Sequence, residues 1–486
     1  MPLETPLEIP EIMLLVASCL RDEELAQCLR VSRTWRDLFR PLRWREVRVG
    51  HKFREPPFNS SGDYPRCFGP RPVDIYHHRD LILDLTLFGD TAGLDKYNYP
   101  NLHKLAIDYT CGTGDSEQKV DLALTEMFPS LIDLRFEKVP VGVTSWITLF
   151  AHHHIRILTL CNILVNTDDA PTFWKACAKL ENLEMDRVII QGGRIPADMM
   201  FDRMRTLYVW EAKEMDETSL IDLALRCPKL EELILATVVI SPDTPPKPIN
   251  LPIPKECWPH LENLQLECNI QDADLGSILE GVGNLICLDL HSCTMGEQAF
   301  RALGLHFSTL VELNLQNCFS ATSSMFRDIM CSCPELEVLK ANNVFANDVT
   351  EGGPWVCQLL RKLKICFLFG SSETYLQLLI FERLSTLVQL ECLTLYYLDF
   401  EYYDERRILE FRLDFGLSHL ESLKQLTTLD FNYPYVPQIG MLEVAWMKTN
   451  WQNLTRISGE LNDNPNENER VISALSKRGI YREWSE

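Results

Sequence analysis

A six-residue pattern, aliphatic-x-x-Leu-x-aliphatic, recurs along most of the chain and constrains its fold more than any other feature. Clear copies are L-H-K-L-A-I from Leu102, L-E-N-L-Q-L from Leu261 and L-V-E-L-N-L from Leu310. Most copies start 24–31 residues apart. One copy alone would mean little, because aliphatic residues are abundant, but a long series at this period is typical of a solenoid. The copies start at Ile82, Leu102, Leu131, Ile155, Leu180, Met204, Leu230, Leu261, Leu285, Leu310, Leu336, Leu360, Leu390, Leu426 and Leu454.

Each copy predicts a short strand, and the rest of each repeat predicts a helix. The last leucines of the pattern alternate, so they point to one face of a strand. Between two copies, Asp216 can cap a helix that ends before Pro228 and carries apolar residues along one face. One such unit cannot bury its own apolar face, so neighbouring units should stack, with parallel strands on the concave side and helices on the convex side.

The junctions and turns of these repeats resemble leucine-rich repeats of the cysteine-containing type. Cys227-Pro228-Lys229-Leu230 and Cys333-Pro334-Glu335-Leu336 match the Cys-Pro-x-Leu junction of that family. The resemblance implies an α/β solenoid, or horseshoe, of about fifteen repeats over residues 80–486, including a C-terminal cap. Ala341 and Gly459 depart from the pattern at the third aliphatic position. A small or polar residue is expected to turn inward after the strand at Val188, Val238, Asn269, Cys293 and Cys318.

Residues 1–49 have helical patterning instead and read as a separate module. Pro10 suits a first helical turn, Asp22 and Ser32 can cap a second and a third helix, and Pro41 should end the third. Three short helices form too small a core for firm stability, so the module should pack against a partner or the next domain. Residues 50–79 read as an irregular connector, because prolines and glycines are concentrated within Lys52–Pro72.

The same module resembles the F-box, through L-E-I-P-E-I from Leu7, C-L-R-V-S-R-T-W from Cys28 and P-L-R-W from Pro41. With the repeats, the chain is similar to F-box/leucine-rich-repeat proteins common in fungi. This resemblance implies a substrate-recognition adaptor of an SCF-type cullin–RING ubiquitin ligase, bound to the cullin complex through a Skp-type linker. Alternatively, the same side chains form only the module's own core or cap the first repeat. The linker contacts implied are Leu7, Ile9, Pro10, Ile12, Leu15, Leu20, Val31, Trp35 and Leu38.

Side chains between the repeat leucines predict a protein-binding surface on the strand face. The first two-thirds should be acidic, and Lys340, Lys362 and Lys364 make the next part basic. Tyr208 and Trp210 add aromatic rings of a kind enriched at binding hot spots. The alternative is a solvated charge pattern without function. The candidate substrate-binding residues are Asp133, Glu184, Asp186, Tyr208, Trp210, Glu232, Glu267, Asp289 and Glu312.

The net charge of −22 limits the classes of partner. It argues against nucleic acid and anionic membranes, which need a basic surface, and favours a protein substrate with a basic segment. The apolar run Ile12–Leu20 is too short to span a membrane and follows acidic residues, so it does not predict a signal sequence. The 17 cysteines contain no Cys-x-x-Cys pair, which favours reduced thiols and a cytoplasmic or nuclear location.

Two insertions interrupt the repeats. Ser241–Pro259 contains seven prolines and predicts an extended loop, either a partner-recognition strip or a plain surface loop. Tyr396–Asp404 interleaves five aromatic residues with acids. It can form an exposed sticky patch or fold back over the long gap between two repeats.

The sequence offers no catalytic site. It contains no phosphate-binding loop, nucleophile elbow or H-E-x-x-H motif, and we expect no cofactor. Three consecutive histidines, residues 152–154, cannot all ligate one metal ion from a regular strand or helix, so no metal is expected. An adaptor needs no nucleophile, because it acts by holding its target near another subunit's chemistry. The competing hypothesis is a leucine-rich-repeat interaction scaffold that works independently of ubiquitination.

Overall fold

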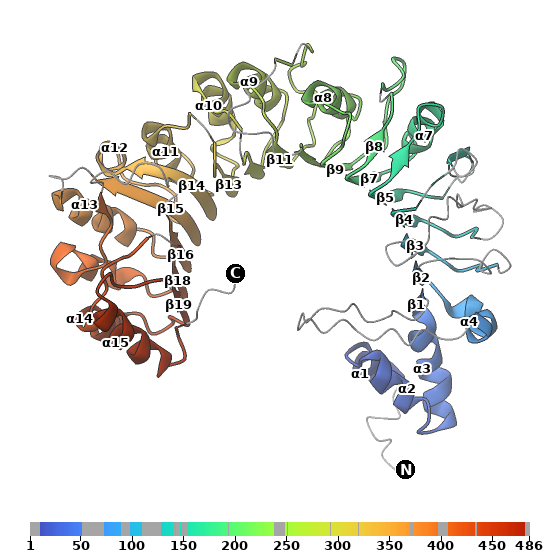
Figure 1. The fold of residues 1–486 in the computed structure, drawn as a ribbon, viewed down its shortest axis with the longest axis horizontal. Coiled ribbons are helices and arrows are strands. Elements are labelled where there is room, and N and C mark those ends of the chain that lie inside the picture. The colour runs from blue at the N-terminus through green and yellow to red at the C-terminus, as the bar shows by residue number, and fades with distance from the viewer. Residues whose placement is uncertain are drawn as a thin grey trace. The chain divides into compact units, whose positions relative to one another are not determined.

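The structure is a computed structural model that describes most of the chain (Figure 1). None of the helices within its described part is long and apolar enough to cross a membrane. The described residues are 10–50, 72–88, 98–108, 128–139, 141, 146–147, 149, 151, 154–237 except 193, 248–369 except 250, 292 and 319, 374–396, 407–432 and 435–481.

The chain forms two compact units, Met1–Pro228 and Lys229–Glu486. The first unit begins with three helices and continues as a sheet of parallel strands in the order β1-β2-β3-β4-β5-β7-β9. Its elements are α1 Pro10–Ser18, α2 Asp22–Cys28, α3 Arg33–Arg45, β1 Glu46–Gly50, α4 Pro72–His78, the 3-10 helix η2 Arg79–Leu81, β2 Asp84–Phe88, β3 Lys104–Asp108, β4 Asp133–Glu137, β5 Ile157–Cys161, β6 Leu164–Val165, α7 Ala170–Cys177, β7 Asn182–Asp186, β8 Ile189–Ile190, β9 Thr206–Trp210 and α8 Glu217–Leu225.

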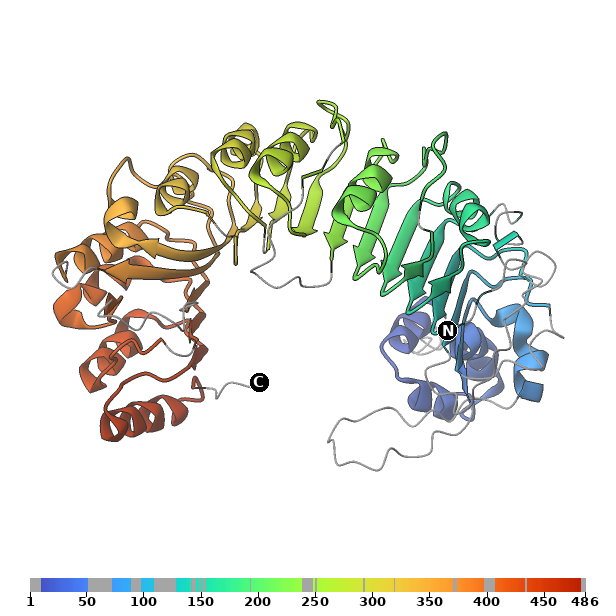
Figure 2. The same cartoon turned by 45° about the horizontal axis from the view of Figure 1, so that its top comes forward.

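The described residues of the second unit form the parallel strands β10-β11-β12-β13-β14-β15-β16-β18-β19, in this order, and β17 pairs antiparallel with β15. Its helices lie on the side of the strands opposite the open sheet face (Figures 1 and 2). Its strands are β10 Glu232–Ala236, β11 Asn263–Glu267, β12 Cys287–Asp289, β13 Glu312–Asn314, β14 Val338–Phe345, β15 Lys362–Phe369, β16 Cys392–Leu395, β17 Arg407–Ile408, β18 Thr428–Phe431 and β19 Arg456–Ser458. Its helices are α9 Asp272–Glu280, α10 Glu297–Leu303, η3 Gly304–His306, α11 Ser323–Met330, α12 Ala346–Thr350, α13 Thr374–Ser385, η4 Leu413–Phe415, η5 Leu417–Ser422, α14 Met441–Asn450 and α15 Pro465–Ser476.

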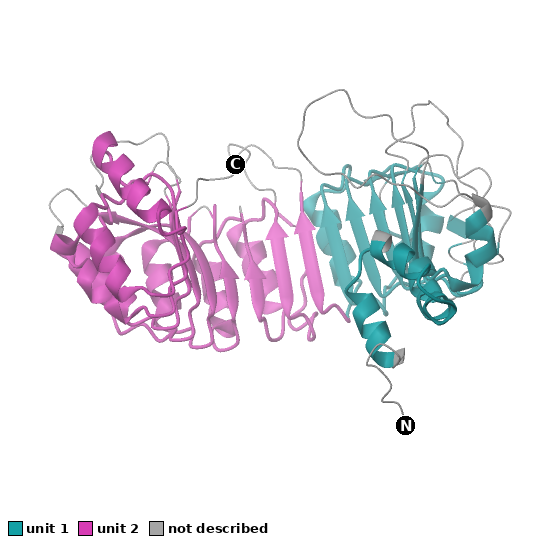
Figure 3. Cartoon of the chain, turned by 90° about the horizontal axis from the view of Figure 1, so that it is seen from below, with its two compact units in different colours: residues 1–228 teal, residues 229–486 magenta. Residues whose placement is uncertain are grey.

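The repeat pattern identified in the sequence is confirmed. The first aliphatic residue of every copy is at most 5% exposed, and a strand begins two residues after it. Within the strands the leucines stand in register, so Leu264 pairs with Leu288 and Leu288 with Leu313. Each fully buried leucine contributes about 1.5–3 kcal/mol, and neighbouring repeats supply the apolar surroundings. The result is a leucine-rich-repeat solenoid, seen as rows of parallel strands within each unit in Figure 3.

Cysteine thiols bridge successive repeats in the second unit. The Sγ atom of Cys268 donates to the Leu235 carbonyl at 3.2 Å, and Cys293 donates to Leu266 at 3.1 Å. Both thiols are buried, as is that of Cys318, which contacts Leu290 in the same way. The expectation of an inward-turning residue was thus correct for Cys293 and Cys318.

The three remaining inward positions differ in their outcome. Val188 is buried as expected. The prediction for Asn269 was wrong, because Asn269 is half-exposed and its neighbour Cys268 occupies the buried position. Val238 lies outside the described residues.

The two departures from the repeat pattern have structural reasons. Gly459 has a φ of 108°, and a Cβ atom there would overlap the carbonyl oxygen of Phe431. Only glycine therefore fits without strain. Ala341 is buried, and its carbonyl oxygen accepts a hydrogen bond from the hydroxyl of Tyr396.

The sheet of the repeats begins within residues 1–49, which the sequence predicted to be a helical module. β1 already belongs to the sheet, because Val47 pairs in register with Leu85 of β2. β1 lies in the segment W-R-E-V-R-V. Its first residue is tryptophan, whereas the other copies begin with an aliphatic residue, so the repeat pattern did not predict this strand. The connector expected over residues 50–79 is also corrected at its end, since Pro72–Leu81 form α4 and η2. Pro72 occupies the first turn of α4, where its missing N–H costs nothing.

The helix ends of the module were predicted in part. Ser32 caps α3, accepting from the Trp35 N–H at 3.1 Å, as expected. The predicted cap of α2 was wrong by one residue, because Arg21 is the N-cap and its N–H donates to Glu24 at 2.8 Å. Pro41 lies inside α3 and does not end it. Its side chain is exposed, so water can satisfy the carbonyl that the proline leaves without an N–H partner.

Candidate functional site

The helices α1, α2 and α3 enclose a very small core. Met13, Ala17, Leu25 and Phe39 are its buried residues. The ring of Trp35 packs edge-on against Phe39, with centroids 5.4 Å apart. A core of this size cannot stabilise three helices firmly.

Helix α1 has apolar residues on two faces, and only one face is covered. Met13 and Ala17, four residues apart, point into the core. Ile12, Leu15 and Val16 share another face and are exposed, Leu15 by 73% of its surface. We call these three residues the α1 apolar face. Val31, in the turn before α3, is 62% exposed. Clustered exposed apolar side chains mark interaction sites in soluble proteins.

The remaining linker-contact candidates divide into two groups. Leu20, Trp35 and Leu38 are half-buried and pack against the module's own core. Leu7 and Ile9 lie outside the described residues, as does the side chain of Pro10.

The sheet face of the first unit carries the predicted acids and aromatics on neighbouring strands. Glu184 stands opposite Tyr208 in the register, and Asp186 stands opposite Trp210. The two rings lie 5.4 Å apart, and both are half-buried. Asp133 lies further along the same face.

Two of these carboxylates are paired with neighbouring cations. Lys104 contacts Asp133 at 3.1 Å, and Arg187 contacts Asp186 at 2.7 Å. Thr159 donates to Glu184 at 3.2 Å. The sequence prediction did not include Lys104 or Arg187, because their strand and turn positions were not compared across repeats. The acidity of this face is therefore lower than its list of acids suggests.

The sheet face of the second unit starts with acids that accept hydrogen bonds from neighbouring amides. Glu232 accepts from Asn263 at 3.3 Å, and Asp289 accepts from Asn314 at 2.8 Å. Glu267 accepts from the Gln265 amide at 3.4 Å. Glu312 is exposed on β13. Lys340, Lys362 and Lys364 follow on β14 and β15.

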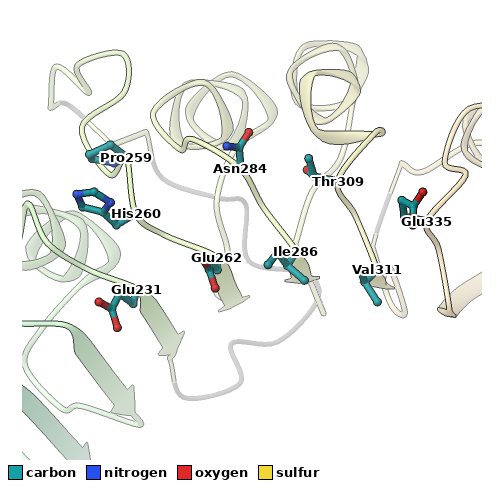
Figure 4. A pocket seen from close by; sticks show the side chains of 9 residues that line it. All are labelled: Glu231, Pro259, His260, Glu262, Asn284, Ile286, Thr309, Val311 and Glu335. Atoms are coloured by element: carbon teal, nitrogen blue, oxygen red, sulfur yellow. The ribbon is translucent and has the colours of Figure 1, made fainter.

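A depression of about 810 Å³, which the sequence did not suggest, lies at the edge of the second unit where its strands begin (Figure 4). Exposed Glu231, Glu262 and Glu335 line it, and Ile286 and Val311 form apolar parts of its wall. These side chains come from successive repeats. Figure 4 shows them spread along the strand ends, without convergence on one point. The arrangement suits a surface contact better than catalysis.

The described parts of the two insertions pack onto the repeats. Trp258 is fully buried, and the Ile249 N–H donates to Asp274 at 2.8 Å. Residues 241–247 lie outside the described part. Tyr396 is buried, which corresponds to the fold-back alternative, whereas residues 397–404 lie outside the described part.

The described residues offer little chemistry for catalysis. No group of three His, Cys, Asp or Glu side chains among them could hold a metal ion. His154 is exposed, and the other two histidines of that run are not described. Burial raises the pKa of the Cys293 thiol to about 12 and that of Cys161 to about 11. These thiols therefore stay protonated near neutral pH and are poor nucleophiles.

Comparisons with known proteins identify a family for the N-terminal helices. Residues 10–49 match the family model described as F-box-like. A comparison with curated protein sequences finds no match. The chain therefore contains an F-box-like domain, and this domain precedes a leucine-rich-repeat solenoid.

Two solved structures are similar to the chain at low identity. The TLR13–ssRNA13 complex shares 15% identity, with 78% of this chain and 57% of that chain covered and a TM-score of 0.42. The LRR ectodomain of the plant membrane receptor kinase GASSHO1/SCHENGEN3 from Arabidopsis thaliana, in complex with CASPARIAN STRIP INTEGRITY FACTOR 2, shares 12% identity. It covers 83% of this chain and 61% of its own, with a TM-score of 0.20. The chain thus spans less than two thirds of either protein, and the fold assignment rests on its own strands and buried leucines.

Proposed function

We propose that this protein is a non-catalytic substrate-recognition adaptor of an SCF-type cullin–RING ubiquitin ligase. Its F-box-like domain binds a Skp-type linker, and its repeats hold the protein to be ubiquitinated. Ubiquitin transfer is accelerated by proximity, because the adaptor places its target near the chemistry of another subunit. A cytoplasmic or nuclear location follows from this role.

The observation that carries the proposal is the α1 apolar face. An amphipathic helix binds a groove through apolar anchors spaced three and four residues apart. Ile12, Leu15 and Val16 have this spacing and stay exposed, although the domain is short of core. Val31 adds a further exposed apolar side chain. A partner that covers these residues would complete a core that the three helices leave unfinished.

The sheet faces of the repeats are the proposed substrate-binding surface. Tyr208 and Trp210 offer half-buried rings beside Glu184 and Asp186. Aromatic rings next to carboxylates suit a lysine or arginine side chain of a partner, through ion pairing and cation–π contact. The basic segment expected of the substrate would contact this region.

The test is binding of the purified chain to a Skp-type linker protein. Leu15→Asp should weaken binding by at least about tenfold, because hot-spot losses reach 2 kcal/mol or more. Leu442→Asp is the matched control, since Leu442 lies on α14 and is 74% exposed against 73% for Leu15. Circular dichroism would show that both variants fold. Equal binding by Leu15→Asp and Leu442→Asp would refute the docking role.

A second candidate function is an interaction scaffold without a ligase. The observation in its favour is that Leu20, Trp35 and Leu38 already pack against the domain's own core. In that case the folded wild-type chain would not bind the linker at all. The same measurement therefore separates the two functions.

A further inference from the structure

Three lysines gather on one sheet face of the second unit. Lys340 lies on β14, and Lys362 and Lys364 lie on the adjacent strand β15. In the parallel register Lys340 stands directly opposite Lys364. The leucines between them, Leu339 and Leu363, are buried, so the lysines are on the opposite, open face.

No carboxylate forms an ion pair with any of these lysines among the residues described in this unit. The next register neighbours are neutral, namely Asn314 beside Lys340 and Thr394 beside Lys364. One strand further, Asp289 accepts from Asn314, and Asp430 contacts Arg456 at 3.2 Å. These two acids are therefore occupied, whereas no carboxylate in the described part of this unit pairs with the three lysines.

Lys364 is held in a defined position. Its Nζ atom lies 5.1 Å from the centroid of the Tyr396 ring, within the range of a cation–π contact. The Tyr396 hydroxyl in turn donates to the carbonyl of Ala341, so the ring is anchored. Burial, and then the charge of Lys340, lower the pKa of Lys364. The two ammonium groups thus repel each other while the surrounding protein keeps Lys364 in place.

This arrangement costs stability in a chain of net charge −22, which has many acids available as partners. Residues that break a local rule without compensation commonly serve a function. Each lysine offers three N–H donors, and lysine is a common ligand of phosphate groups. An anion bound between β14 and β15 would remove the repulsion and satisfy these donors.

We propose that Lys340, Lys362 and Lys364 form a binding site for a compact, multiply charged anionic group on a protein segment held by the repeats. A phosphorylated side chain or a pair of carboxylates has this chemistry. The inference rests on the proposed role of the sheet face in protein binding, and it does not depend on the linker. A partner would thus present an anion to β14 and β15 of the second unit.

The test compares the full-length chain with the double variant Lys340→Gln/Lys364→Gln. The matched control is Lys448→Gln/Lys477→Gln, which removes the same charge from exposed lysines on α14 and at the end of α15. The probes are three degenerate peptide libraries that differ at one fixed position, which is phosphoserine, glutamate or serine. The readout is the amount of peptide retained. The double variant should retain about tenfold less anionic peptide than the control, because hydrogen bonds between an ammonium group and an anion are stronger than those between neutral groups.

The libraries also identify the source of the anion. Preference for phosphoserine over glutamate identifies a phosphoryl group, and equal retention identifies carboxylates. A second measurement uses inorganic phosphate alone, which should raise the melting temperature of the wild type and of the control variant more than that of the double variant. If the double variant equals the control in both measurements, the site does not exist. Binding of the double variant to the Skp-type linker is measured as well. A double variant that binds the linker but not the anionic peptide tests the lysine site independently of the ligase proposal.

Discussion

The F-box-like domain and the repeats differ in the exposure of the leucines that characterise them. In the repeats, the leading aliphatic residue of every copy is at most 5% exposed, because the next repeat covers it. In α1, Leu15 is 73% exposed although it belongs to an equally apolar segment. A stacked repeat buries its apolar side chains against neighbouring repeats of the same chain. A three-helix domain is too small to cover all of its own apolar side chains. The exposed leucine of the F-box-like domain therefore belongs to the surface that we propose a partner covers, whereas the buried leucines of the repeats stabilise the fold.

The largest expected effect is in the core of the F-box-like domain. Phe39→Ala removes one of its few buried side chains and should destabilise the domain by about 3–5 kcal/mol. Leu15→Ala should change its stability by no more than about 0.5 kcal/mol, because the side chain is exposed. Amide hydrogen exchange of residues 10–45 measures both. A comparable loss in Leu15→Ala would mean that the α1 apolar face is covered within the chain, and the contrast would fail.

In the repeats, one buried leucine should affect its neighbours. Leu313→Ala should cost about 2–5 kcal/mol, since Leu313 is 1% exposed and stands in register with Leu288 and Leu339. Because stability in a solenoid depends on adjacent units, hydrogen exchange should also accelerate in β12 and β14. Leu305→Ala, at an exposed position, is the control. Confinement of the effect to β13 would contradict nearest-neighbour stacking.

Removal of a buried thiol in the repeats should cost more stability than removal of an exposed thiol in the F-box-like domain. Cys318→Ala removes the hydrogen bond to the Leu290 carbonyl and should cost about 1 kcal/mol. Cys19→Ala, at an exposed position of the F-box-like domain, should have almost no effect. Denaturant midpoints of the two variants provide the measurement. Equal midpoints would remove the structural role assigned to the cysteines between repeats.

The smallest expected effect is on pH dependence. His306 is buried in the repeats and donates from Nε2 to the Leu279 carbonyl at 3.0 Å. Burial lowers its pKa in the folded state, so the unfolded chain binds a proton more readily. The stability that neutral His306 contributes is complete above the unfolded pKa of about 6.5 and is lost as the pH falls below it. His306→Gln should therefore lose less stability than the wild type between pH 7 and pH 5.5, as measured by denaturation at each pH. Parallel pH curves would show that His306 does not titrate differently on folding.

Local patterns predicted the parts of the structure that depend on a few neighbouring residues. The recurrence of L-x-x-L-x-L located the repeat strands, because alternation along a strand follows from backbone geometry alone. Asp216 caps α8, accepting from the Ser219 N–H at 2.9 Å, as a short acidic side chain before an apolar run should. The effect of Pro41 was predicted wrongly, because the prediction used the local pattern alone. Its effect depends on which side of α3 faces water, and no local pattern contains that information.

Sequence alone determined the repeat period, the leucines that form the core and the short helices of the F-box-like domain, since each follows from residue spacing within one element. Only the tertiary structure decided which charges meet. Lys104 neutralises Asp133 from another strand, while Lys340 faces Lys364. It also decided that α1 keeps Leu15 exposed while Met13 is buried. Contacts between strands depend on register across 20 or more intervening residues, and burial depends on what lies opposite a side chain. Neither quantity is encoded in the neighbourhood of a single residue.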